Sequence, residues 1–186
     1  MEVAKQQDEW LMAQVALDQR EHLEPLVRRY AHCLLTFVRW MVGQEAVAEE
    51  IFQEVFLAVW DKRRQYRFPL PFKNWLYSIA ANQCRLHLRR NKNRPTMLHE
   101  DQWETAPADD SPSPSHLAML TETAAQVKQA VSRLPAQQRS VVVLRIWQEL
   151  SYAEIAEIVG CSEATARSHM SHALAELRVV LPDVNQ

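Results

Sequence analysis

Two short helical patterns that meet at one glycine lie between Leu150 and His172, and this stretch restricts the possible fold more than any other part of the chain. Ser151 and Glu154 have the Ser-x-x-Glu spacing of a capping box, which starts a helix by pairing backbone N–H groups that lack an intrahelical partner. Apolar residues then recur at helical spacing up to Gly160, and glycine readily takes the left-handed conformation that ends a helix. The pattern predicts a helix that starts after Ser151 and ends at Gly160.

A second helical pattern follows at once, with Ser162 as its N-cap and Glu163 beside the positive end of the helix. Its apolar residues have the spacing of a buried helix face: Ala166, Met170, Ala173, Leu174 and Leu177. The opposite face carries short or hydrogen-bonding side chains: Arg167, Ser168, Ser171 and His172. The two helices predict a helix-turn-helix, whose second helix enters the DNA major groove. A helical hairpin with a solvated polar face has the same local pattern, so the rest of the chain must decide.

The composition favours an all-α protein that lies in the cytoplasm. The chain has 186 residues and only two glycines, and its 47% hydrophobic content is enough for real cores. No run of about 18 apolar residues exists and the N-terminus has no apolar signal segment, so we expect no membrane insertion. Cys33, Cys84 and Cys161 fit neither a disulfide framework nor a zinc site, and we interpret them as reduced packing residues.

The net charge of −2 hides a strongly uneven distribution along the chain. Residues 1–61 have a balance of −6, residues 95–116 a balance of −5, and residues 117–186 a balance of −1. Residues 62–94, the basic block, hold ten Lys or Arg and no Asp or Glu. So sharply bounded a cluster of cations indicates a surface for nucleic acid, which the isoelectric point of the whole chain conceals.

The N-terminal third has three stretches with helical spacing, at residues 10–17, 23–38 and 47–60. The third of them carries polar side chains beside its apolar stripe: Glu49, Glu50, Gln53 and Glu54. Such a cluster of carboxylates is either a solvated helix face or a docking surface for a basic partner. A metal or acid–base site is disfavoured here, because no ligand pattern that includes histidine accompanies the carboxylates.

The basic block contains a stiff loop and a long helix. Pro69 and Pro71 exclude a helix from residues 65–72, and a helix is predicted from Phe72 to Arg90. We assign to its buried side Trp75, Leu76, Ile79, Ala80 and Leu86, and to its exposed side Lys73, Asn74, Tyr77, Asn82, Arg85 and Arg89. Arginine neutralises phosphate and aromatic rings stack on unpaired bases, so the pattern indicates a single-stranded nucleic-acid surface. The alternative is that Phe72 and Trp75 are core residues.

The chain divides at a change of composition. Four prolines and five carboxylates mark residues 95–116 as an acidic linker. We therefore predict two small helical domains, at residues 1–94 and 117–186. In the second, helices at residues 121–133 and 136–148 join the helix-turn-helix in a four-helix domain.

Several motifs in this order resemble the extracytoplasmic-function (ECF) sigma factors, group IV of the sigma-70 family of bacterial transcription initiation factors. The matching stretches are Ala48–Leu57 (AEEIFQEVFL), Phe72–Asn82 (FKNWLYSIAAN), Leu134–Arg139 (LPAQQR) and Leu150–Ala156 (LSYAEIA). The resemblance covers residues 10–94 and 117–181. It implies a protein that binds core RNA polymerase and directs transcription from specific promoters, with no enzymatic activity, no cofactor and no metal site.

The resemblance also implies which residues meet each partner. The coiled coil of the largest polymerase subunit would be bound by Glu49, Glu50, Gln53, Glu54, Phe56 and Trp60. The −10 promoter element would be melted and one of its bases captured by Arg64, Tyr66, Arg67, Phe68, Lys73, Asn74, Trp75, Tyr77, Asn82 and Arg85. The −35 element would be read by Arg145, Thr165, Arg167, Ser168, His169, Ser171 and His172.

Other implied partners are the polymerase flap and a separate anti-sigma protein that clamps both domains. The chain departs from the family at Glu50, where aspartate is usual, and at His169 and His172, where arginines are common. We therefore expect a slightly altered polymerase contact. Because the C-terminal domain is also nearly neutral, we expect weak DNA affinity of the isolated protein.

Two other functions fit parts of the sequence. A stand-alone helix-turn-helix regulator would need a ligand pocket or a dimer interface in its N-terminal half, where this chain has an acidic helix and a basic block. A metal-dependent nuclease would need a constellation of metal ligands that the sequence lacks.

Overall fold

The computed structural model describes the backbone of residues 2–92 and 114–181 and the side chains of residues 8–91 and 123–181. Within these ranges every regular element is a helix, which confirms the all-α prediction. Most of the predicted linker, residues 95–116, lies outside the described residues. The first C-terminal helix, α5 (Pro114–Arg133), starts within the last three residues of that linker.

The N-terminal half contains four α-helices and two short 3-10 turns. The α-helices are α1 (Glu2–Ala16), α2 (Leu23–Val42), α3 (Glu45–Asp61) and α4 (Phe72–Lys92). The 3-10 turns are η1 (Arg20–His22) and η2 (Arg63–Gln65). Gly43 ends α2 in the left-handed conformation with φ 82° and donates its N–H to the carbonyl of Arg39. Helices α2, α3 and α4 pack against one another, and α1 lies against α2 and the start of α4.

The C-terminal half continues with α6 (Ala136–Ile146), α7 (Tyr152–Val159) and α8 (Glu163–Val180). The predicted capping box is present, because Ser151 and Glu154 each accept the other's backbone N–H through their side chains. Gly160 ends α7 with φ 75°, and the Ser162 side chain accepts the N–H of Thr165 at the start of α8. The helix pair predicted between Leu150 and His172 is therefore confirmed.

Helix α6 is the element that joins the two halves. Four consecutive side chains at its centre, from Val141 to Leu144, are fully buried. Since these four side chains point in different directions around the helix, this part of α6 must be covered on all sides, and α6 packs against α2, α4, α7 and α8. The buried residues of both halves consequently form one hydrophobic cluster.

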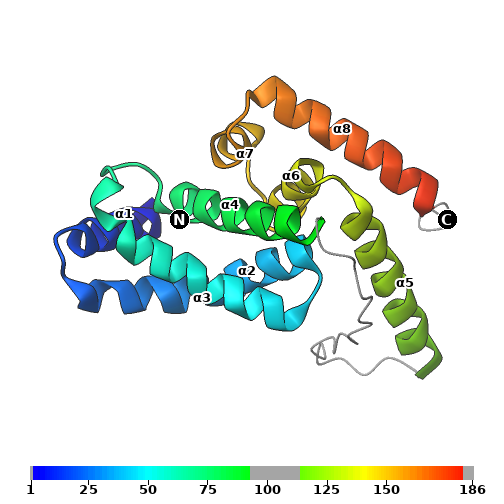
Figure 1. Cartoon of the computed structure of the whole chain (residues 1–186), viewed down its shortest axis with the longest axis horizontal. Helices are drawn as coiled ribbons and strands as arrows, with labels where there is room; N and C mark the ends of the chain where they lie inside the picture. The colour runs from blue at the N-terminus through cyan, green and yellow to red at the C-terminus, as the bar shows by residue number, and fades with distance from the viewer. Residues whose placement is uncertain (1, 93–113, 182–186) are drawn as a thin grey trace.

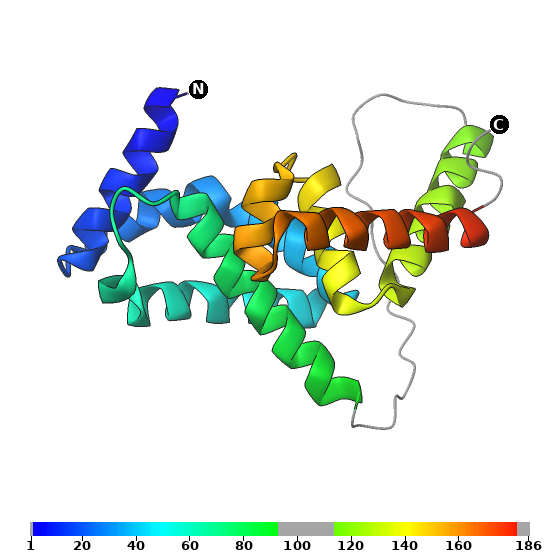
Figure 2. The same ribbon diagram turned by 90° about the horizontal axis from the view of Figure 1, so that it is seen from above.

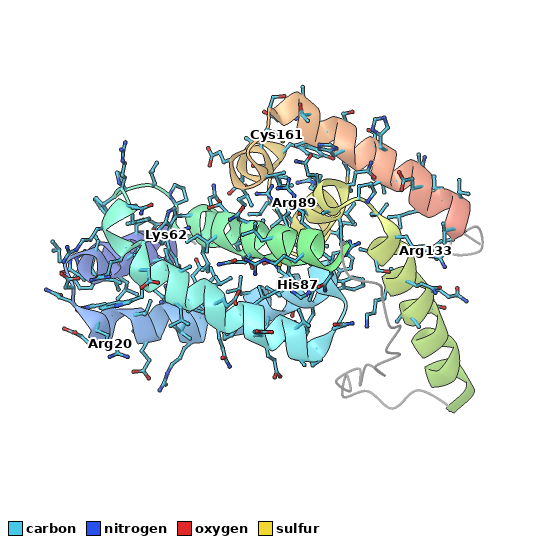
Figure 3. The ribbon with its side chains drawn as sticks, in the orientation of Figure 1. Arg20, Lys62, His87, Arg89, Arg133 and Cys161 are labelled. Atoms are coloured by element: carbon cyan, nitrogen blue, oxygen red, sulfur yellow. The ribbon has the colours of Figure 1, made fainter. Side chains whose placement is uncertain are left out.

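Figures 1 and 2 show α7 lying on α4 in both views, with α8 continuing away from it towards the C-terminus. The turn between α7 and α8 is marked by Cys161 in Figure 3. The side of α4 that faces α7 is thus an internal surface of the molecule, covered by the first helix of the helix-turn-helix.

This packing corrects the predicted faces of α4. Asn74 and Tyr77, which we expected to be exposed, are buried, because α7 and the residues before it cover them. Leu86, which we expected to be buried, is 38% exposed. The inner stripe of the second half of α4 follows the i, i+4 spacing of Ala80, Cys84 and Leu88, and Leu86 lies off this stripe.

The different burial of the cysteines predicts different reactivities of their thiols. Burial in the core raises the pKa of the Cys84 thiol to about 12, so almost none of the reactive thiolate exists at pH 8. Iodoacetamide should therefore modify the exposed Cys33 of the native protein and leave Cys84 intact, as read by peptide mass spectrometry. Denaturant should make all three react, whereas rapid native labelling of Cys84 would contradict this packing.

Candidate nucleic-acid interface

The described part of the basic block begins at the end of α3, passes through η2 and the loop that follows, and continues along α4. Figure 3 shows Lys62 at the end of α3 and His87 and Arg89 near the far end of α4. The Arg63 guanidinium lies 4.2 Å from the centre of the Trp60 ring and donates to the Trp60 carbonyl at 2.7 Å. Cation–π and charge-assisted contacts of this kind fix the arginine at the base of the loop.

The loop formed by residues 66–71 has a buried inner side and an apolar outer side. Tyr66 is buried, and its hydroxyl donates to the Leu70 carbonyl, which closes the loop. The Tyr66 ring packs edge-on against the Trp75 ring, with 5.4 Å between the two ring centroids. Phe68 and Leu70 are 61% and 56% exposed. The alternative interpretation holds for Phe72, which is fully buried in the core, and Trp75 is partly buried and packs on the core.

The residues predicted for the −10 element fall into two groups by exposure. Those open to solvent are Arg64, Arg67, Phe68 and Asn82. Those buried or half-buried are Tyr66, Lys73, Asn74, Trp75, Tyr77 and Arg85. Lys73, Asn74, Tyr77 and Arg85, in the second group, all make polar contacts to the C-terminal half.

Gln148, which follows α6, is the centre of these contacts. Its side-chain oxygen accepts the Tyr77 hydroxyl at 2.6 Å, and its amide donates to the Cys33 carbonyl of α2 at 3.4 Å. Its backbone oxygen accepts the Lys73 ammonium at 3.3 Å. Burial raises the pKa of Tyr77 well above its usual value, so the phenol remains protonated and keeps this hydrogen bond. One glutamine thus connects α2, α4 and the C-terminal half.

Further contacts extend this interface on both sides of Gln148. Asn74 donates to the Glu157 carboxylate of α7 at 2.9 Å, and Arg85 donates to the Val159 carbonyl at 3.1 Å. The Arg85 cation thereby lies at the negative end of α7, where positive charge is stabilising. Trp40 and Trp147 pack at a centroid distance of 4.2 Å.

Two buried polar side chains of this interface, Arg139 and Asn74, have only part of their polar atoms hydrogen-bonded. Arg139 donates to the carbonyls of Met41, Ser132 and Leu134, which ties α6 to the end of α2. The Arg139 Nε and the Asn74 carbonyl oxygen are both buried without a hydrogen-bond partner among the described residues. An unpaired buried oxygen costs about 1–3 kcal/mol, and water would remove this cost if the two halves separated.

The acidic face of α3 points to solvent. Its exposed residues are Glu49, Glu50, Gln53 and Glu54, as expected. Phe56, also predicted to contact polymerase, is 8% exposed and belongs to the core, because it is part of the inner stripe with Val55 and Val59. Trp60 is half-buried beneath Arg63. Sequence reasoning missed Leu57, which is 65% exposed on the acidic face and could have been found from its i, i+3 and i, i+4 spacing to the acidic residues.

The residues predicted for the −35 element form one exposed face on α6 and α8. All of Arg145, Thr165, Arg167, Ser168, Ser171 and His172 are exposed, and His169 is half-buried. The structure brings Arg145 and Arg167 together over a residue that the sequence analysis did not assign. Their guanidinium carbons lie 5.1 and 4.5 Å from the centre of the Tyr152 ring.

Tyr152 therefore supports both arginines of this face. Arg145 also donates to the Leu150 carbonyl at 2.8 Å, and Arg167 pairs with Glu163 one turn earlier at 2.5 Å. No local sequence signal identified Tyr152, because its role depends on tertiary contacts to Arg145 of α6 and Arg167 of α8.

The described residues offer little support for other kinds of site. Among them, no group of three or more His, Cys, Asp or Glu is placed to hold a metal ion. No described helix has the length and apolar character needed to cross a membrane.

Sequence comparison places both halves of the chain in known families. Residues 26–94 match the family Sigma-70 region 2, and residues 124–177 match the family Sigma-70, region 4. The ECF RNA polymerase sigma factor SigM of Mycobacterium tuberculosis is 31% identical over 177 residues, which cover 95% of this chain and 85% of that protein. The RNA polymerase sigma-H factor of Pseudomonas aeruginosa is 28% identical over 92% of each chain.

Two solved structures share the fold. CnrH, determined in complex with the cytosolic domain of CnrY, superposes with a TM-score of 0.72 at 22% identity, over 96% of this chain and 99% of that chain. The sigma factor RpoE, determined with the anti-sigma factor NepR from Bartonella quintana, gives a TM-score of 0.68 at 22% identity, over 88% and 98%. The arrangement of helices described above is therefore shared with known proteins.

The central position of Gln148 can be tested by Gln148→Ala. The substitution leaves the Tyr77 hydroxyl unpaired, and we expect it to weaken the packing of α7 on α4 by about 1–3 kcal/mol. Amide hydrogen exchange in α7 and in the first turns of α4 should become faster. Gln137→Ala, which alters an exposed glutamine on α6, is the control. Equal exchange in the two variants would show that Gln148 does not hold the halves together.

Proposed function

The chain belongs to the extracytoplasmic-function sigma factors of the sigma-70 family, and from this premise we propose how its residues read and open a promoter. As a member of this family it directs transcription initiation by RNA polymerase. In our proposal, α8 reads the −35 element. The loop of residues 66–71, from here on called the promoter loop, melts the −10 element together with α4. The observation that carries the proposal is the block of ten cations with exposed Phe68 on its loop.

The exposed face of α8 carries side chains suited to reading the −35 element. Ser168, Ser171 and His172 are hydrogen-bonding side chains of modest length that reach base edges when the helix lies in the major groove. Arg167 supplies the longer contact to a base or phosphate, and Arg145 a phosphate contact from α6. Tyr152 holds the two guanidinium groups at one side of the recognition helix.

Opening of the −10 element requires a partner for an unpaired base and for its phosphates. Exposed Phe68 offers a stacking surface, Asn82 an amide that can hydrogen-bond a base edge, and Arg64 and Arg67 neutralise the backbone. Extraction of a base from the stack costs a few kcal/mol, and stacking together with hydrogen bonds offsets this cost.

Four further residues proposed for this step become available only when the two halves separate. Lys73, Asn74, Tyr77 and Arg85 are engaged with Gln148 and α7. DNA cannot reach the same atoms while α7 lies on α4. We therefore propose that the free protein is closed and that binding to polymerase, with its own affinity for each half, favours the open form.

The partners follow from the same proposal. The acidic face of α3, with Glu49, Glu50, Gln53, Glu54 and Leu57, would bind the coiled coil of the largest polymerase subunit, and the C-terminal half would meet the flap. An anti-sigma protein is the proposed regulator, in keeping with the complexes of CnrH with CnrY and of RpoE with NepR. The protein would work in the cytoplasm, as a non-catalytic initiation factor without cofactor or metal.

We retain residues 1–94 and 117–186 as the two functional domains, because the matched segments 26–94 and 124–177 fall within them. No observation favours the stand-alone helix-turn-helix regulator, since the N-terminal half carries the sigma region 2 match rather than a ligand domain.

Base capture is tested by Asn82→Ala. The exposed amide contributes to no described packing, so we expect polymerase binding to be unchanged and promoter opening to fall about tenfold, the effect of one lost hydrogen bond to an extracted base. Permanganate footprinting of the −10 element with core polymerase measures opening. An unchanged opening rate would remove Asn82 from the capture site.

The support of the −35 arginines is tested by Tyr152→Ala and Tyr152→Phe. Alanine removes the ring on which Arg145 and Arg167 lie, and we expect promoter-specific transcription to fall by about 3–10-fold. Phenylalanine keeps the ring and should retain most of the activity. Equal loss on a template with a scrambled −35 element would contradict a role in reading that element.

A further inference from the structure

Helix α1 and the turn after it lie before the matched sigma region 2 segment, which starts at residue 26. None of the roles proposed above involves them. Three carboxylates of this segment nevertheless make specific contacts to the rest of the protein: Asp8, Glu9 and Asp18. Two of these contacts lie at the two ends of the promoter loop.

Glu9 is bound at the end of the loop where α4 begins. Its carboxylate accepts the backbone N–H of Phe72 at 2.9 Å, and the Glu9 side chain is buried there. The first bond of the helix itself runs from the Trp75 N–H to the Pro71 carbonyl, so the Phe72 N–H lies outside the helical ladder. Proline has no side-chain acceptor, and Glu9 thus acts as the N-cap of α4 from 63 residues away.

Asp18 is bound at the other end of the loop. One of its carboxylate oxygens accepts Arg63 at 2.6 Å, and the other accepts Arg64 at 2.7 Å. Asp18 itself has φ 68°, in the left-handed region that aspartate tolerates better than most residues. The Arg64 and Arg63 guanidinium groups hold the pKa of the Asp18 carboxyl below its usual range, so this carboxylate is charged throughout the neutral range.

Asp8 explains why α1 can serve as a rigid support. Its carboxylate accepts the Tyr30 hydroxyl at 2.8 Å and pairs with Arg29, both on α2. Leu11, Met12 and Val15 bury the same side of α1 in the core. The helix is therefore fixed to α2, and Glu9 and Asp18 extend from this fixed position to α4 and η2.

We propose that Glu9 and Asp18 are positioning residues for promoter opening, which hold both ends of the promoter loop so that Phe68 is presented in its capturing conformation before DNA arrives. Neither residue touches DNA in this proposal; each acts through the loop. A loop already held in its bound conformation loses less conformational entropy on binding, which favours capture of the base. The inference builds on the proposed function and adds α1 to the melting machinery.

The test uses the full-length variants Glu9→Ala, Glu9→Gln and Asp18→Ala. Glu176→Ala, which removes an exposed carboxylate on α8, is the control for the change in charge. The first readout is amide hydrogen exchange of Phe72 in the free protein. Exchange should be about fivefold faster in Glu9→Ala and nearer to wild type in Glu9→Gln, which keeps an oxygen acceptor.

The second readout is promoter opening with core polymerase, beside the affinity for polymerase. We expect Glu9→Ala and Asp18→Ala to open the −10 element about fivefold more slowly at unchanged polymerase affinity, with partial rescue in Glu9→Gln. Wild-type Phe72 exchange in Glu9→Ala would disprove the cap. Faster exchange with normal opening, or a similar opening defect in Glu176→Ala, would disprove the positioning role.

The two levels of the proposal fail separately. If the wild-type chain opens no promoter with core polymerase, the proposed promoter chemistry is wrong and the positioning role is wrong with it. The exchange of the Phe72 amide in the free protein still decides whether Glu9 caps α4.

Discussion

The structure depends on the burial of α6 between two sets of helices. Its four central side chains, from Val141 to Leu144, contact neighbours on every side, and this merges what would be two small cores into one. Gln148 then continues from α6 into the space between α2 and α4 and makes polar contacts with both. The apolar surface supplies the stabilisation, and the hydrogen bonds fix the orientation in which the halves meet.

The same packing links stability to function. In the proposed mechanism, the surface of α4 that meets unpaired DNA is the surface on which α7 lies, so closed packing and promoter contact would compete for Asn74, Tyr77 and Arg85. Water can satisfy the unpaired Asn74 oxygen and the polar contacts of this face when the halves separate, whereas the burial of α6 opposes separation. The promoter loop, in contrast, is held by α1 and the turn after it, through buried apolar residues of α1 and the carboxylates of Glu9 and Asp18. The proposed mechanism therefore combines a promoter loop held in place by α1 with a helix, α4, that α7 covers in the closed form.

Structural features that depend on neighbouring residues could be predicted from the sequence, whereas contacts between distant residues could not. The capping box at Ser151, the left-handed Gly160 and the helical periods follow from neighbouring residues, so the helix-turn-helix and the all-α class could be predicted. The burial of Asn74 and Tyr77 depends on residues 83 and 71 positions away, and no local pattern reveals it. The Glu9 cap and the Tyr152 ring are likewise tertiary contacts. The assignment of individual residues to promoter elements stays a prediction.

The competition between closed packing and promoter contact is tested most directly by a reversible lock. In a chain with Cys33 and Cys161 replaced by serine, Asn74→Cys and Glu157→Cys can be joined by a short, reducible thiol cross-linker, since the native side chains at these positions are in contact. We expect the locked protein to lose promoter opening with core polymerase and to regain it after reduction. Opening at the same rate before and after reduction would contradict the account, because α4 would then work while α7 still covers it.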